Sequence, residues 1–165
     1  NGGLKQAKKF SWSLTAKKVT SVLIETTIQA FNLREINLII FPDWTQSEEV
    51  IAAELEKVIG TLATHIDSQY MTLLIDISNS DDDYAEMLLS AVSMNLLMQD
   101  LDLSEGLEIS LVSQLGDMQW KALLPRIEAR IVLEYQNQQA LANFKTESIS
   151  AYHLDEFSTL LLRPS

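Results

Sequence analysis

The sequence predicts an α/β domain with a mostly parallel, Rossmann-like three-layer sheet of four to five strands and helices on both faces. Short apolar runs alternate with longer stretches in which apolar residues recur at helical spacing. Strands that alternate with helices form right-handed βαβ units, which build parallel sheets. The 165 residues suffice for one domain, and 47% hydrophobic against 21% charged residues is a globular composition.

The chain opens with a predicted basic helix. Residues 1–18 carry a charge of +5 and contain no acidic residue. Ser11 is a candidate N-cap, and the helix is expected to end near Phe31 and Asn32. Its apolar face holds Trp12, Ala16, Val19, Leu23 and Ala30. We assign residues 1–32 to this tail-like helix and residues 33–160 to the α/β domain. Because the chain starts Asn1-Gly2-Gly3, we expect it to be a segment of something longer.

The first half of the domain contains two predicted strand–helix pairs. Residues 36–41 (INLIIF) form an apolar run that Pro42 stops, as in a buried strand. Thr45 and Glu48 have the spacing of a capping box before a helix. Its apolar positions are Ile51, Leu55, Val58, Ile59 and Leu62. Residues 71–77 (MTLLIDI) form the second strand, and the next helix is marked by Ala85, Leu88, Leu89, Val92 and Leu96.

The second half continues the alternation. Residues 107–112 alternate like a third strand, and Asp117 is expected to cap a helix that carries Trp120 and Ile127. Residues 129–133 form a fourth strand, residues 136–144 a short helix, and a last strand lies within residues 149–154.

Charge and composition exclude several classes of function. Residues 19–165 carry 7 basic and 23 acidic residues, and a body with a charge of −16 repels nucleic acid. Membrane contact is expected only through the basic helix. The absence of cysteine excludes disulfides and thiolate metal sites. No apolar run approaches the roughly 20 residues that span a bilayer. We expect a cytoplasmic protein.

Nothing in the sequence predicts catalytic residues. No dinucleotide-binding, Walker A or nucleophile-elbow motif occurs. His65 and His153 are the only histidines, and neither has a nucleophile or carboxylate at a recognisable spacing.

In parallel sheets, ligands bind at the carboxyl ends of the strands. The candidate ligand-binding residues are therefore those that follow the predicted strands, namely Asp43, Trp44, Gly116, Asp117 and Glu134. Asp76, Ser78 and Ser80 form a D-x-S-x-S sequence after the second strand. This spacing resembles the divalent-metal motif of von Willebrand A type domains, and such hard oxygen ligands suit Mg²⁺ or Mn²⁺. The alternative for this loop is an acidic turn in which Ser80 or a neighbouring aspartate caps the next helix.

Two passages resemble GT-B type glycosyltransferases, which have two Rossmann-like halves. Residues 9–16 (KFSWSLTA) are similar to the opening of their last helix. Residues 113–133 resemble the part of their C-terminal half where a strand ends in a glycine, followed by a short helix and the next strand. The order implies that residues 1–31 end one glycosyltransferase unit and residues 36–155 form a degenerate C-terminal half. The chain also resembles domains of large, multi-domain cyanobacterial glycosyltransferases.

The resemblance implies a site for a nucleotide sugar. The other possible cofactor is Mg²⁺ or Mn²⁺ at Asp76, Ser78 and Ser80. Trp44 would stack on a sugar, Gly116 would let a phosphate approach, and Glu134 would hold a hydroxyl group. The family's basic residues are missing from residues 42–49, and its glycine-rich turn is missing from residues 134–144. The sequence therefore indicates a module that binds or positions rather than catalyses.

The alternative is a non-enzymatic interaction or scaffold domain, and a metal-dependent adhesion domain is a weaker one. The expected partners are other domains of the same polypeptide or a second copy. Met87, Met94 and Met98 share the second predicted helix and would form an adaptable contact surface if exposed.

Overall fold

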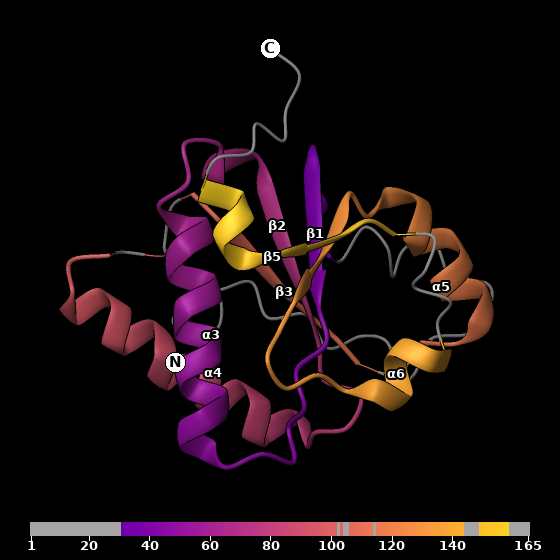
Figure 1. Ribbon diagram of the computed structural model, residues 1–165, viewed down its shortest axis with the longest axis horizontal. Coiled ribbons are helices and arrows are strands. Elements are labelled where there is room, and N and C mark those ends of the chain that lie inside the picture. The colour runs from indigo at the N-terminus through magenta and orange to yellow at the C-terminus, as the bar shows by residue number, and fades with distance from the viewer. Residues whose placement is uncertain (1–30, 102, 104–105, 114, 144–148, 159–165) are drawn as a thin grey trace, which may run out of the picture.

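A five-stranded, all-parallel sheet lies at the centre of the protein (Figure 1). The computed structural model describes residues 31–101, 103, 106–113, 115–143 and 149–158. The strands are β1 (Ile36–Ile40), β2 (Met71–Asp76), β3 (Glu108–Val112), β4 (Ala129–Val132) and β5 (Ala151–His153). Their order across the sheet is β3-β2-β1-β4-β5. The predicted fold class is confirmed.

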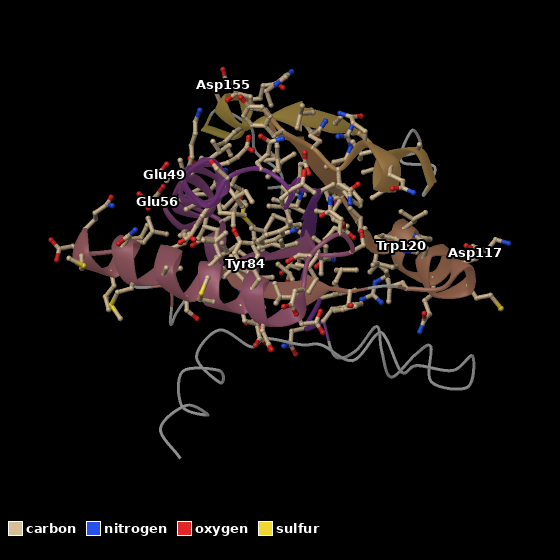
Figure 2. The ribbon with its side chains drawn as sticks, turned by 90° about the horizontal axis from the view of Figure 1, so that it is seen from below. Glu49, Glu56, Tyr84, Asp117, Trp120 and Asp155 are labelled. Carbon is tan, nitrogen blue, oxygen red and sulfur yellow. The ribbon has the colours of Figure 1, made fainter. Side chains whose placement is uncertain are left out.

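Helices cover both faces of the sheet (Figures 1 and 2). One face carries α3 (Glu48–Ala63) and α4 (Asp82–Met98), and the other carries the shorter α5 (Asp117–Leu123) and α6 (Gln138–Asn143). Three 3₁₀ turns complete the described elements: η3 (Ser68–Tyr70), η4 (Leu124–Arg126) and η6 (Leu154–Ser158). The predicted helix before residue 31 lies outside the described residues.

The core consists of two apolar clusters, one on each side of the sheet. The larger joins α3 and α4 to the strands, and the smaller joins Phe31, α5 and α6 to the opposite face. Every residue of β1 and β2 is buried, because helices cover both faces. Asn37, the buried polar residue of β1, is satisfied by the carbonyls of Arg34 and Arg126 and by the Arg34 N–H group.

Helix α3 begins two residues later than the expected capping box would place it. Ser47 is its N-cap and accepts a hydrogen bond from the Val50 N–H group at 3.4 Å. The Thr45 hydroxyl instead donates to Asp43 Oδ1 at 2.6 Å. In α4, Asp81 is the N-cap and accepts from the Asp83 N–H group. An aspartate of the acidic stretch therefore caps α4, as expected if the loop is an acidic turn at the start of this helix.

Successive strands are added on one side of β1 as far as β3, and β4 and β5 are then added on its other side. The chain leaves β1 into α3 on one face of the sheet, and it leaves β4 into α6 on the other. This is the topological switch point, the place where open parallel sheets bind ligands beyond their strand ends.

Candidate functional site

The predicted site residues lie along one edge of the sheet but come from four different strands. Asp43 and Trp44 follow β1, Asp76 ends β2, Gly116 follows β3 and Glu134 follows β4. The strands before Gly116 and Glu134 are three spacings apart in the sheet. At about 4.8 Å a spacing this is roughly 14 Å. The strand order therefore spreads the residues along the edge.

Main-chain hydrogen bonds close the switch point. The Asn137 N–H group donates to the Phe41 carbonyl at 2.8 Å, and the Asp43 N–H group donates to the Tyr135 carbonyl at 3.2 Å. Between these bonds, Pro42 and Gln136 form an antiparallel bridge. Backbone thus joins the two loops between which a Rossmann-type ligand binds. The N–H groups of Asp43 and Asn137, which could otherwise bind a phosphate, are already used.

Trp44 is part of the core rather than of the strand-end surface. Only 5% of the residue is exposed, and its indole N–H group donates to the Asp76 carbonyl at 2.8 Å. Its ring meets Tyr84 of α4 edge-on, with 6.4 Å between the ring centroids. Figure 2 shows Tyr84 on the inner side of α4. A ring held in this way does not present a face on which a sugar could stack.

Asp43 is used to hold its own turn together. Its carboxylate accepts hydrogen bonds from the side chains of Gln46 at 3.0 Å and Thr45 at 2.6 Å. Asn79, after β2, also donates to it at 3.5 Å. The bonds from Gln46 and Thr45 are the main reason why the pKa of Asp43 is lowered. The arrangement links the loops after β1 and β2 and keeps this carboxylate ionised.

Asp76 is the most deeply buried carboxyl group at the edge. The residue is 0% exposed, and burial raises its pKa to about 6 although the Ser78 hydroxyl and N–H groups donate to it. The Ser78 hydroxyl lies 2.8 Å from Oδ2, whereas Oδ1 has no hydrogen-bond partner among the described residues. Asn137 also opposes the rise in pKa, and its amide donates to the Ser78 hydroxyl at 3.3 Å.

The three candidate metal ligands do not face a common point. Ser78 Oγ lies against Asp76 Oδ2, but the Ser80 hydroxyl donates to the Asp81 carbonyl at 2.9 Å. Within the part of the chain that the structure describes, no group of three or more His, Cys, Asp or Glu side chains could hold a metal ion. Asp76 and Ser78 would therefore need other oxygen ligands to bind Mg²⁺ or Mn²⁺.

Gly116 and Asp117 form the start of α5. The Gly116 N–H group donates to Gln119 Oε1 at 2.6 Å, so it is already occupied. A Cβ atom at Gly116 would lie 3.5 Å from that same oxygen, an ordinary contact, so the backbone here does not require glycine. Asp117 is exposed and points away from the sheet in Figure 2, whereas Trp120 points inward.

Glu134 lines a groove together with Tyr135, whose carbonyl takes part in closing the switch point. The groove has a volume of about 860 Å³ and lies between α3, the end of β4 and the segment from β5 into η6. Glu54 of α3 accepts hydrogen bonds from the N–H groups of Glu134 and Tyr135, while burial raises its pKa. Lys57, His153 and Asp155 also line the groove.

The methionines of α4 form an exposed apolar stripe. Met87 and Met94 are each 51% exposed and Met98 is 77% exposed, whereas the opposite side of the helix is buried in the core. Residues 87, 94 and 98 are seven and four positions apart, which places them on one side of a helix. We call these three residues the methionine stripe.

Three residues of this edge were not predicted from the sequence. Asn137 caps α6 by accepting from the Ala140 N–H group, and asparagine before a helix was the available signal. Asn79 joins two loops that are adjacent only in the folded sheet. Arg130 donates to Gln136 Oε1 at 2.8 Å, so a cation from within β4 reaches the switch-point loop.

No family model matches the chain, and no curated protein or solved structure matches it either. Among the described residues, no helix has the length and apolar character needed to cross a membrane. The fold and the edge geometry thus define a Rossmann-like α/β domain whose switch point is closed by its own backbone.

Proposed function

We propose that this domain is a non-catalytic module of a larger glycosyltransferase-like polypeptide and acts by binding or positioning. The observation that carries the non-catalytic part is the backbone bridge between Pro42 and Gln136. The loops at residues 41–47, 77–81, 113–116 and 133–137 also lack lysine and arginine. The diphosphate group of a nucleotide sugar is bound by cations or free N–H groups, and both are scarce at this edge.

The glycosyltransferase part of the proposal is supported by the resemblance of residues 9–16 and 113–133. The second passage runs from the end of β3 through Gly116, α5 and η4 into β4. This is the order of strand, glycine, short helix and strand that the resemblance implies. Residues 9–16 lie outside the described residues, so their part of the argument comes from the sequence.

Ligand binding separates a positioning module from a surviving sugar-nucleotide site. We expect no thermal shift with uridine or guanosine nucleotides and their sugars, with or without Mg²⁺ or Mn²⁺. A ligand at 100 times its Kd would add about 2.7 kcal/mol, which is several degrees for a domain of this size. A shift with one nucleotide sugar would contradict the closed switch point, and Arg130→Ala should then abolish it. A shift with metal alone would instead favour a site at Asp76 and Ser78.

The link to glycosyl transfer is tested in the natural, longer polypeptide. Removing residues 33–160 should leave the chemical step of sugar transfer within about threefold of the intact protein, and it should raise the KM for the acceptor. Complete loss of transfer by a deletion variant that still folds would show that this domain supplies catalytic groups. Absence of any sugar transfer by the intact polypeptide would remove the glycosyltransferase assignment.

The methionine stripe favours a second candidate function, a protein-interaction or scaffold domain. Exposed methionines form adaptable contacts, because their side chains are flexible and polarisable. A Met94→Glu, Met98→Glu variant should keep the native melting temperature and lose association with the rest of its polypeptide or with itself. Size-exclusion chromatography with light scattering measures both kinds of association. Met118→Glu, at a 63% exposed position of α5, is the matched control. Unchanged association in the double variant would exclude the stripe as a contact surface.

A further inference from the structure

The groove beside β4 follows one face of α3 over about three turns. The residues of this helix that line it are Val50, Ala53, Glu54, Lys57, Val58 and Thr61. They recur at intervals of three and one positions, which places them on a single face. At 1.5 Å a residue, the lined part of the helix is about 16 Å long. This length corresponds to about five residues of an extended chain.

Apolar side chains alternate with a carboxylate along this face. Val50 is half-buried, Val58 is buried, and Glu54 lies four positions from each of them. Four residues of helix rise about 6 Å, so the three side chains follow one another in steps of about that length. Leu133 and Leu154 add apolar surface from β4 and η6. The groove therefore offers an apolar contact, an acidic contact and a second apolar contact in a row.

The middle of the groove is negative. Glu54 accepts a hydrogen bond from the Glu134 N–H group at 2.5 Å, so the two acidic residues are adjacent. Burial is the main cause of the raised pKa of Glu54, and the charge of Glu134 adds to it. Asp155 also lines the groove, and Figure 2 shows it on the opposite side of α3 from α4. Lys57 is the only lysine or arginine among the described residues of the lining. A cation brought by an occupant would relieve the repulsion between the carboxylates.

An extended peptide has the matching spacing. Its alternate side chains point to the same side and are about 6.6 Å apart, close to the steps from Val50 to Glu54 and on to Val58. We propose that the groove binds an extended segment of a partner protein in which a lysine or arginine lies two residues from an apolar residue on either side. The basic side chain meets Glu54 and Glu134, and the apolar side chains cover the valines. A second copy of the chain has a net charge of −11, so charge favours a different, basic partner.

A synthetic peptide tests this proposal. The probe has arginine at its centre, leucine two residues away on either side, serine between them, blocked ends and a fluorescent label. Fluorescence anisotropy with the full chain, at about 0.15 M salt, should show saturable binding. Replacing the arginine with citrulline, its uncharged isostere, should weaken binding at least about 10-fold, because hydrogen bonds to a charged group are lost. Equal affinity of the two peptides would overturn the proposal.

A second peptide separates the groove from general attraction to an acidic protein. It has the same composition, but its arginine is moved by one position, so that the basic side chain points away from the two leucines. We expect it to bind at least about 10-fold more weakly than the probe. Equal binding would show attraction without spacing and would overturn the proposal. Absence of saturable binding by the probe up to about 1 mM would overturn it as well.

Matched substitutions on α3 locate the acidic contact. Glu54→Gln keeps an oxygen that accepts from the N–H groups of Glu134 and Tyr135 but removes the charge. It should weaken the arginine peptide at least about 10-fold and leave the citrulline peptide unchanged. Glu56→Gln is the control, because Glu56 faces α4 and accepts from Asn95 and Gln99. Both peptides should bind this control within about twofold of the native chain. Equal losses in the two variants would assign the attraction to overall charge and would contradict the proposal.

Two further variants keep the test decisive. If Glu54→Gln lowers the melting temperature, Glu134→Gln at an exposed position removes a charge from the same place. Ala53→Trp, also at an exposed position, should fill the groove and abolish binding of both peptides. Unchanged affinity in Ala53→Trp would place the binding elsewhere and overturn the proposal. The inference goes beyond the proposed function and does not rest on it, since it concerns the groove and not the closed switch point.

Discussion

Asp76 is the residue at which burial has the clearest measurable effect. Because burial raises its pKa to about 6, the folded state keeps a proton that the unfolded state, with a pKa near 3.9, has already lost. The free energy of unfolding should therefore fall as the pH rises from about 4 to about 6, and the loss persists above that range. Asp76→Asn should remove this pH-dependent fall in the free energy of unfolding, because asparagine does not titrate.

Urea denaturation of both proteins between pH 4 and 7 measures this effect. The lowered pKa of Asp43 contributes in the opposite sense, since its stabilisation is lost as the pH falls. Asp43 is present in both proteins, so the difference between them isolates Asp76. Parallel pH profiles would contradict a raised pKa at this position.

Trp44 is a second residue whose burial decides its role. The sequence predicts an aromatic ring directly after a strand, but it does not show on which side of the chain the ring packs. In the structure the indole lies in the larger core cluster. Trp44→Ala should therefore cost about 3–5 kcal/mol of stability through the cavity that it leaves. Met118→Ala, at an exposed position, should change stability by less than about 0.5 kcal/mol in the same denaturation experiment. A small effect at Trp44 would mean that the ring lies on the surface.

At the scale of elements, the contribution of the N-cap of α3 to stability can be tested by a single substitution. Ser47→Ala removes the cap of α3 and should cost about 1 kcal/mol. Ser90→Ala makes the same replacement at an exposed position inside α4, where alanine favours the helix, so stability should stay equal or rise slightly. Chemical denaturation monitored by circular dichroism compares the two variants. Equal losses would show that the hydroxyl of Ser47 does not cap α3.

The strands and helices of the domain follow from local sequence patterns, whereas the edge geometry does not. The run from Ile36 to Phe41 predicts a strand by itself, and β1 spans Ile36–Ile40. The closure of the switch point depends on the register of β1 and β4, in which Leu38 lies opposite Ala129. No local pattern carries that register. The bridge at Pro42 and the partnership of Asn137 with Ser78 therefore became visible only in the folded chain.

At the scale of the whole molecule, the candidate site of the sequence was a row of strand-end residues, and the fold changes what these residues do. Trp44 and Asp43 stabilise the domain, Gly116 and Asp117 start a helix, and Glu134 lies beside a different concavity. Strand order explains the separation, since β3 and β4 have two strands between them. Position after a strand predicts at which edge of the sheet a residue lies, but convergence on one point requires neighbouring strands.

The position of β1 at the centre of the sheet also constrains how the chain folds. β1 and β2 pair across about 35 residues, whereas Leu38 and Ala129 in the β1–β4 pair are about 90 residues apart in the chain. The longer loop adds less than about 1 kcal/mol of closure entropy, so equilibrium stability is little affected. The rate is affected more, because pairings distant in sequence slow folding. We therefore expect β1, β2 and β3 to assemble as an early nucleus, with β4 and β5 docking on the free edge of β1 afterwards.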